Sequence, residues 1–234
     1  MDEGGTFGGP CKALLQALRA ASAELLPCGT FRHRAPNNEM KEVKYMGSDT
    51  KNFEHELRDA LRGEEWLNLS DRRPSFEGIE YGIDRSATNV LSGKTAGLTT
   101  HRLRCVLTGA VATCHRLHRI RTLEDPHCRC CGHPDETLEH ITDECPAFEQ
   151  LRAQVATPDE WEELPVCLRR HGIMPAWQFP MPSRYAENQE DDRKALAADM
   201  QYLLTDMVEM RMQHMPELAG PCPRWHRNVR PRLG

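Results

Sequence analysis

The segment Cys128-Arg-Cys-Cys-Gly132, followed by His140 and Cys145, decides how the middle of this chain can fold. Its Cys-x₂-Cys pair and the later His-x₄-Cys pair have the spacing of a tetrahedral zinc site, with one ligand pair on a tight turn and the other on a second element. The glycine suits such a turn, because a residue there often needs a positive φ angle. We therefore predict one structural zinc ion per chain, held by Cys128, Cys131, His140 and Cys145.

Two neighbouring side chains leave this ligand set open. Cys130 or His133 could replace an adjacent ligand, although the x₂ spacing and the following glycine favour Cys131 over Cys130. The alternative to a metal site is a group of unbound thiols in a loop. A catalytic zinc is disfavoured, because four protein ligands leave no coordination position for water.

The local sequence also predicts how the second ligand pair is presented. Asp135 is the expected N-cap of a short helix over 137–143, which would direct His140 inward and end at Pro146. Within the loop the apolar anchors are Leu138 and Ile141. With so little apolar surface to bury, we expect a zinc binding energy of roughly 10–16 kcal/mol to stabilise the loop.

A basic stretch precedes the zinc segment. Between His101 and Leu123 the chain has no acidic residue but five arginines: Arg102, Arg104, Arg116, Arg119 and Arg121. The zinc loop has the opposite charge, with five acids between 135 and 144. If the chain contacts phosphate, we expect these arginines to do so. The alternative is a solvated basic face that pairs with the acidic zinc helix.

Away from the cysteine cluster, the sequence predicts a mostly α fold, with short helices around a small zinc knuckle and flexible termini. Helices are expected over 50–68 and 76–92, over 96–120 with a break at Gly109, and as two short helices around Pro158. No β alternation is evident. The predicted division is a flexible leader over 1–49 with one short helix (11–26) and a linker (28–49), a helical region over 50–175 with the zinc-binding module (core 96–150), an acidic loop over 176–191, a long amphipathic helix over 192–214 and a basic disordered tail over 215–234.

The helix over 192–214 carries an apolar seam whose members are spaced by alternating steps of four and three: Leu196, Met200, Leu203, Met207 and Met210. About two heptads are covered, fewer than a coiled coil usually needs to be recognised. Packing on the chain's own domain is therefore favoured, and a helix-mediated protein partner is the alternative.

Composition sets the wider limits. The chain has 234 residues, 39% hydrophobic and 6% aromatic, which is thin for one large core. The net charge of −5 excludes a bulk basic character, so any nucleic-acid signal must be local. Neither a signal peptide nor a membrane-length apolar run is evident, which predicts no membrane association. With ten cysteines, we expect an intracellular location, nuclear or cytoplasmic, where clustered thiols bind metal rather than form disulfides.

The motifs also carry a family resemblance. The relevant residues are Leu103-Arg104, Leu107-Thr108-Gly109, Arg116-Leu117-His118-Arg119-Ile120, Cys128-x₂-Cys131-Gly132, Glu136-Thr137-Leu138-Glu139-His140 and Cys145-Pro146. Together they resemble the zinc-binding segment of non-LTR retrotransposon reverse transcriptases. Residues 79–92 and 167–175 look like flanks of divergent retroelement-derived proteins. The resemblance covers less than half of the chain.

In that family the segment lies C-terminal to the polymerase, near an RNase H domain in some members. The resemblance implies the same four zinc ligands, but no catalytic residue carries over, because Asp191-Asp192 lies in an acidic run without flanking strands. We expect a retroelement-derived zinc-binding protein that is not an enzyme and binds RNA or DNA weakly. The alternatives are a zinc-stabilised protein-interaction module that uses the 192–214 helix, and an inert remnant.

Overall fold

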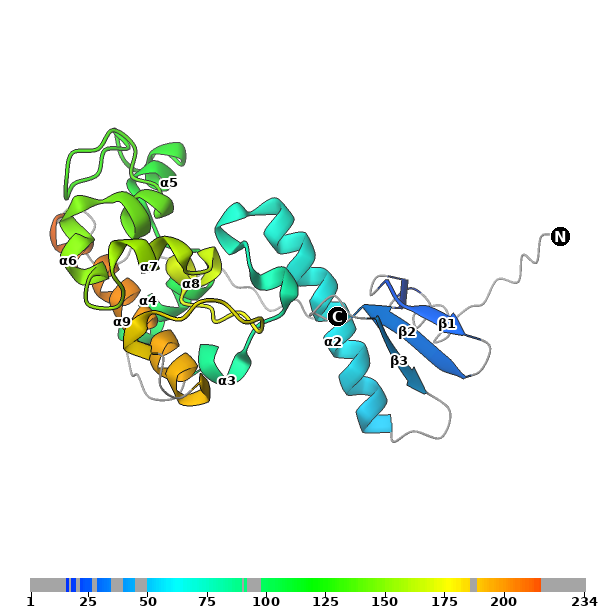
Figure 1. Ribbon diagram of the computed structural model, residues 1–234. Coiled ribbons are helices and arrows are strands. Elements are labelled where there is room, and N and C mark those ends of the chain that lie inside the picture. The colour runs from blue at the N-terminus through cyan, green and yellow to red at the C-terminus, as the bar shows by residue number, and fades with distance from the viewer. Residues whose placement is uncertain are drawn as a thin grey trace.

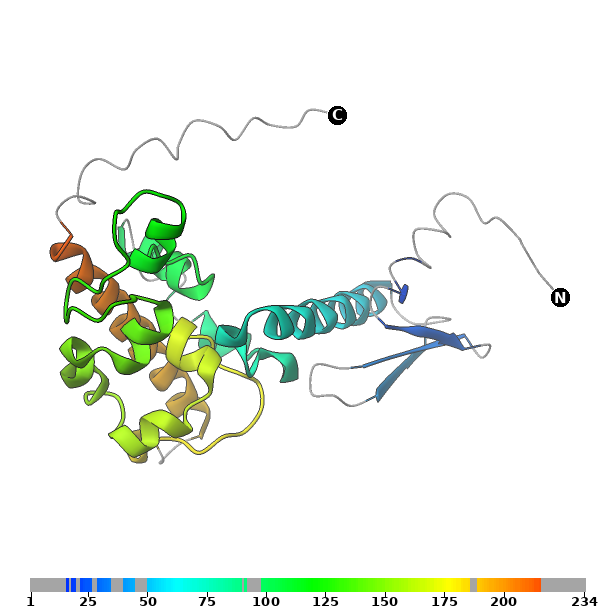
Figure 2. The same ribbon diagram turned by 90° about the horizontal axis from the view of Figure 1, so that it is seen from above.

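The computed structural model describes residues 16, 18–19, 22–26, 29–34, 40–44, 50–89, 91, 98–185 and 189–215. Over these residues the fold is mostly α, as predicted. A small sheet lies at one end, a helical body lies at the other, and the long helix α2 (Thr50–Arg72) runs between them (Figures 1 and 2). None of the described helices combines the length and the apolar character needed to cross a membrane. The predicted tail lies outside the described residues beyond Met215.

The sheet is the main departure from the prediction. Strands β1 (Glu24–Leu26), β2 (Thr30–Arg34) and β3 (Met40–Lys44) pair antiparallel in that order. The expected helix through residue 26 and the expected linker over 28–49 are therefore wrong for these residues.

The strands were missed because polar side chains occupy inward positions. On β2 the buried residues include Thr30 and His33 as well as Phe31. The apolar signal is a single cross-strand row, in which Phe31 lies opposite Leu25 on β1 and Val43 on β3. One apolar residue per short strand does not produce a visible alternation in the sequence.

Helix α2 was predicted over 50–68 and continues to Arg72, ending before Pro74 as expected. Its C-terminal turns anchor it to the helical body. There Trp66 and Leu69 pack against a small cluster of buried residues: Phe76, Ile79, Cys167 and Ile173.

The single helix predicted over 76–92 is replaced by three short pieces. These are the 3₁₀ turns η1 (Pro74–Phe76) and η2 (Ile79–Tyr81) and the helix α3 (Arg85–Thr88). Gly78 and Gly82 flank η2 with φ angles of 106° and 102°, which a helix cannot contain. The break was readable from these two glycines.

The predicted break at Gly109 is confirmed. Helix α4 (Leu98–Leu107) and helix α5 (Cys114–Arg119) flank it, and its φ angle is 63°. A Cβ atom at this position would also lie 3.0 Å from Cε1 of buried His171, so space as well as backbone geometry favours glycine.

After the zinc segment the chain forms three short helices, where two were predicted around Pro158: α6 (Glu149–Arg152), α7 (Pro158–Glu163) and α8 (Val166–His171). Helix α7 begins with a capping box between Thr157 and Glu160. A 3₁₀ turn, η5 (Ser183–Tyr185), then leads to the last helix.

Helix α9 (Gln189–Gln213) runs through the centre of the body, against α3, α4, α6 and α8. Four seam residues, Leu196, Met200, Leu203 and Met207, are buried in the main core, whereas Met210 is 39% exposed. The seam therefore packs on the chain's own domain, and these four residues are not available to a partner helix in this fold.

Candidate metal centre

Four side chains from two segments meet beside the main core. Cys128 and Cys131 lie on the turn after α5, whereas His140 begins the π-helical turn η3 (His140–Glu144) and Cys145 follows it. Their ligand atoms all lie within 4.8 Å of one another. Cys130 is not in this group, so the structure brings together the four residues that the spacing predicted.

The distances fit a tetrahedral zinc ion. With Zn–S bonds of about 2.3 Å and a Zn–N bond of about 2.0 Å, two sulfur ligands lie about 3.8 Å apart and a sulfur and a nitrogen about 3.5 Å apart. The Sγ atoms of Cys128 and Cys145 are separated by 3.9 Å. Sγ of Cys131 lies 3.2 Å from Nε2 of His140. The four donor atoms are close enough together for one metal ion to bind all of them.

The turn that carries the first two cysteines has the expected glycine geometry. Gly132 has a φ angle of 79°, and its N–H donates to the carbonyl oxygen of Cys128 at 2.8 Å. Burial raises the pKa of the Cys128 thiol, whereas the backbone N–H groups of Cys130 and Cys131 lower it by hydrogen bonding to the sulfur. These N–H groups therefore favour the thiolate that a metal requires.

The second ligand pair lies on a turn that differs from the predicted helix. The N–H of Cys145 donates to the carbonyl oxygen of His140 at 2.6 Å, five residues back, as in a π-helix. Thr137, not Asp135, caps the turn, because its Oγ1 accepts from the N–H of His140 at 3.0 Å. Asp135 instead contacts His115 Nδ1 at 2.7 Å.

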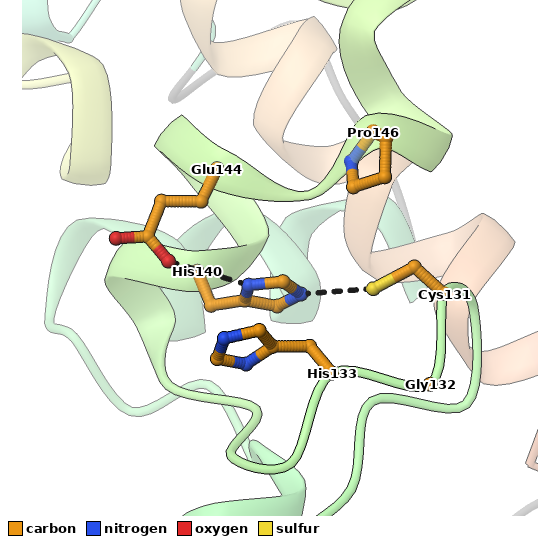
Figure 3. A pocket seen from close by; sticks show the side chains of 6 residues that line it. All are labelled: Cys131, Gly132, His133, His140, Glu144 and Pro146. Atoms are coloured by element: carbon orange, nitrogen blue, oxygen red, sulfur yellow. Dashed lines mark hydrogen bonds and ion pairs between the residues drawn. The ribbon is translucent and has the colours of Figure 1, made fainter.

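A carboxylate orients the histidine. Nδ1 of His140 lies 3.4 Å from Oε2 of Glu144, which leaves Nε2 directed toward Cys131 (Figure 3). Second contacts of this kind fix the tautomer and orientation of a metal-binding imidazole. The ring of His133 stacks on that of His140 with centroids 4.3 Å apart, and both line an open pocket beside the site (Figure 3).

Comparisons with known proteins give one partial match. The matched segment covers 53 residues, at 42% identity, of the protein named "Retrovirus-related Pol polyprotein from type-1 retrotransposable element R1 4" of Nasonia vitripennis. Part of this chain is similar to a retrotransposon polyprotein. The match spans 23% of the chain and 13% of that protein, so it supports a retroelement origin and covers only a small part of the relative. No protein-family model and no solved structure matches.

The acids of the zinc loop are paired rather than free. Glu136 accepts from Nε of Arg211 on α9 at 2.6 Å and from the N–H of Cys114 at 2.8 Å. Arg170 on α8 donates to Glu139 at 2.6 Å and to Asp143 at 2.9 Å. The loop is therefore bound to α8 and α9 by charge, and its acidity is largely compensated within the fold.

A further arginine supports the turn that holds the last ligand. Arg152 on α6 donates to the carbonyl oxygens of Thr142 at 3.4 Å and Cys145 at 3.1 Å. The Cys145 carbonyl also accepts from the N–H of Phe148 at 3.1 Å, so Arg152 adds a second donor beside the last ligand. Sequence reasoning missed Arg152, Arg170 and Arg211. Only Glu144, four residues after His140, had a local signal in its spacing.

The five arginines predicted to contact nucleic acid differ in whether their side chains form ion pairs within the fold. Nη1 of Arg102 pairs with Glu209 of α9 at 2.6 Å. The side chains of Arg104, Arg116, Arg119 and Arg121 are exposed, and within the described part of the chain none of them forms an ion pair. Four of the predicted five therefore remain free for an external anion.

Proposed function

We propose that this chain is a retroelement-derived zinc-binding protein whose metal is structural and whose exposed arginines bind nucleic acid weakly. The observation that carries the proposal is the convergence of three sulfurs and one imidazole nitrogen at distances that suit tetrahedral zinc. Zinc would supply a cross-link between the turn at 128–132 and the segment 140–145. The proposal assigns no catalytic step to the chain.

The proposed zinc site is tested by metal analysis of the purified protein. We expect about one zinc per chain. Cys131→Ser should abolish stoichiometric zinc, because it removes one of the four converging donors. Cys130→Ser is the matched control and should retain the metal, since its sulfur is not among the four. The reverse result would show that Cys130 is the ligand.

The proposed binding of nucleic acid depends on charge. Zinc bound by three thiolates and a neutral imidazole leaves the site near −1, so the metal itself does not attract phosphate. The free arginines could neutralise about three to four phosphates, which predicts a slope of roughly −2 to −4 for log affinity against log salt. Base preference should be slight, because arginine–phosphate contacts carry little sequence information.

A double variant tests the proposed binding of nucleic acid. Arg116→Ala with Arg119→Ala should flatten the salt slope by about one to two units and leave the zinc content unchanged. Arg102→Ala is a control with a weaker expected effect, since that guanidinium is already paired with Glu209. If the unmodified protein shows no salt-sensitive binding at low ionic strength, the proposal that it binds nucleic acid is wrong. An inert zinc-stabilised remnant then becomes the better interpretation.

A further inference from the structure

Helix α5 ends in an unusual way. The N–H of Arg121 donates to the carbonyl oxygen of His118 at 2.8 Å, and the N–H of Thr122 donates to that of Leu117 at 2.8 Å. This nested pair of bonds defines a Schellman motif, in which the residue at the position of Arg121 adopts the left-handed conformation. Its φ angle is 59°, and among the described residues only Ser22 and Arg121 are non-glycine residues with a positive φ.

Glycine is the usual residue at this position of a Schellman motif, because any Cβ atom is unfavourable in left-handed backbone. Arginine therefore makes the α5 C-terminus less stable than glycine would. A backbone outlier of this kind suggests a role for the side chain when nothing within the fold explains it. The Arg121 side chain is exposed, and no intramolecular ion pair offsets its strain within the described part of the chain.

The two preceding residues extend the same feature. Arg119 is exposed, and Ile120 is 61% exposed, more than the other large hydrophobic residues that the described surface exposes. Figure 1 shows α5 at the upper edge of the helical body. Residues 119–121, here called the α5 tip, thus present two free guanidinium groups with an exposed apolar side chain between them.

We propose that the α5 tip is the principal contact with a nucleic-acid strand. This inference rests on the proposed function and says which residues are responsible for the binding. Arg119 and Arg121 bind phosphate oxygens, and Ile120 packs on the sugar and base surface next to them. A nucleic acid alternates charged phosphates with less polar sugars and bases, which matches this arrangement. A purely solvated basic face would gain stability from glycine at position 121 and lose nothing.

The experiment uses the zinc-loaded full chain and a mixed-sequence single-stranded DNA oligonucleotide over a series of salt concentrations. Arg121→Gly should relieve the backbone strain and raise the melting temperature by about 2–4 °C. The same variant should bind more weakly at low salt and flatten the salt slope by about one unit. Arg121→Lys should keep the parent slope, and Arg72→Ala, a basic residue on α2, should change neither binding nor slope.

The variant Ile120→Ser tests whether the α5 tip recognises nucleic acid or any polyanion. It should lower the affinity for DNA several-fold with an unchanged salt slope, and inorganic polyphosphate should compete less well than DNA at equal phosphate concentration. The inference is overturned if Arg121→Gly binds with the parent slope, or if Ile120→Ser binds DNA as tightly as the parent. Either result leaves the proposed function standing when the parent itself shows salt-sensitive binding. An absence of such binding by the parent overturns both.

Discussion

His171 is the residue whose chemistry most clearly ties stability to pH. It is buried, and its Nδ1 lies 2.9 Å from the carbonyl oxygen of Val106, so Nδ1 carries the proton. Nε2 is buried without a hydrogen-bond partner among the described residues. Burial and the charges of Arg170 and Arg73 lower the pKa of His171 from 6.5 to about 4. The fold therefore holds this imidazole neutral.

The lowered pKa predicts a loss of stability in mild acid. Above pH 6.5 the imidazole is neutral in both states, but between pH 6.5 and about 4 the unfolded chain binds a proton that the folded chain excludes. The free energy of unfolding should fall across this window by on the order of 3 kcal/mol and level off below it. Denaturant unfolding in excess zinc at several pH values would measure the loss.

Two variants isolate this contribution. His171→Phe keeps a ring that can stack on Phe76, whose centroid lies 3.8 Å from that of the imidazole, and should flatten the dependence between pH 4 and 6.5. His55→Ala, which removes an exposed imidazole on α2, should leave it unchanged. An unaltered pH profile in His171→Phe would show that other groups cause the acid instability.

Glu144 is expected to affect zinc binding by orienting His140. Glu144→Ala removes the acceptor next to Nδ1 and should weaken zinc binding by about tenfold, at the low end of such effects because the carboxylate is half exposed. Glu144→Gln keeps an acceptor and should lose less. Competition with a chromophoric chelator would measure both, with Glu149→Ala as an exposed acidic control. Equal zinc affinity in all three variants would refute the orienting role.

Ion pairs connect several of the elements that the core brings together, and of those among the described residues the pair between α9 and the zinc loop is the most buried. The side chains of Arg211 and Glu136 are 1% and 0% exposed. Arg211→Met leaves a buried carboxylate without its cation and should lower the free energy of unfolding by roughly 3–5 kcal/mol. Adding Glu136→Gln should restore part of the loss, which a double-mutant cycle measured by denaturant unfolding would quantify.

A partly exposed pair between α4 and α9 provides the comparison. Arg102 and Glu209 are 24% and 46% exposed, so Arg102→Ala should cost less than about 1 kcal/mol. If the two arginine variants are equally destabilising, burial is not what distinguishes the two pairs.

The elements also show what the sequence could and could not predict. The Cys/His cluster that could hold a metal ion, the break at Gly109 and the long helix α9 were predicted because each has a local cause: ligand spacing, a glycine, or a run of apolar residues at helical period. Arg211 lies 75 residues after Glu136, and no local pattern links them. The strands of the sheet were missed because His33 and Thr30 occupy buried positions where apolar residues were expected.

On the scale of the whole molecule, the zinc loop has contacts with the rest of the fold that do not depend on a metal. Ile141 and Phe148 are buried in the main core with Met200 and Met207 of α9. The pairs with Arg170 and Arg211 add two further attachments. The expectation that zinc would stabilise this segment counted only the apolar residues within the loop, and the structure adds contacts with the core, α8 and α9 to them.

Removal of zinc should accordingly loosen one region rather than unfold the chain. Hydrogen exchange followed by mass spectrometry, before and after chelation, should show increased exchange over 128–145 first and then in the last turn of α9, which Arg211 ties to the loop. The centre of α9 should keep its protection, because its buried residues do not depend on the metal. Peptides from β1–β3 and the first turns of α2 should not change, since α2 meets the body through Trp66 and Leu69 near its C-terminal end. Phe148→Ala, which creates a cavity in the core, is the positive control and should increase exchange in α9 even with zinc bound. Equal increases in the sheet and the zinc loop on chelation would mean that the whole chain unfolds as one unit, and that the metal carries the stability that this structure attributes to the core and the ion pairs.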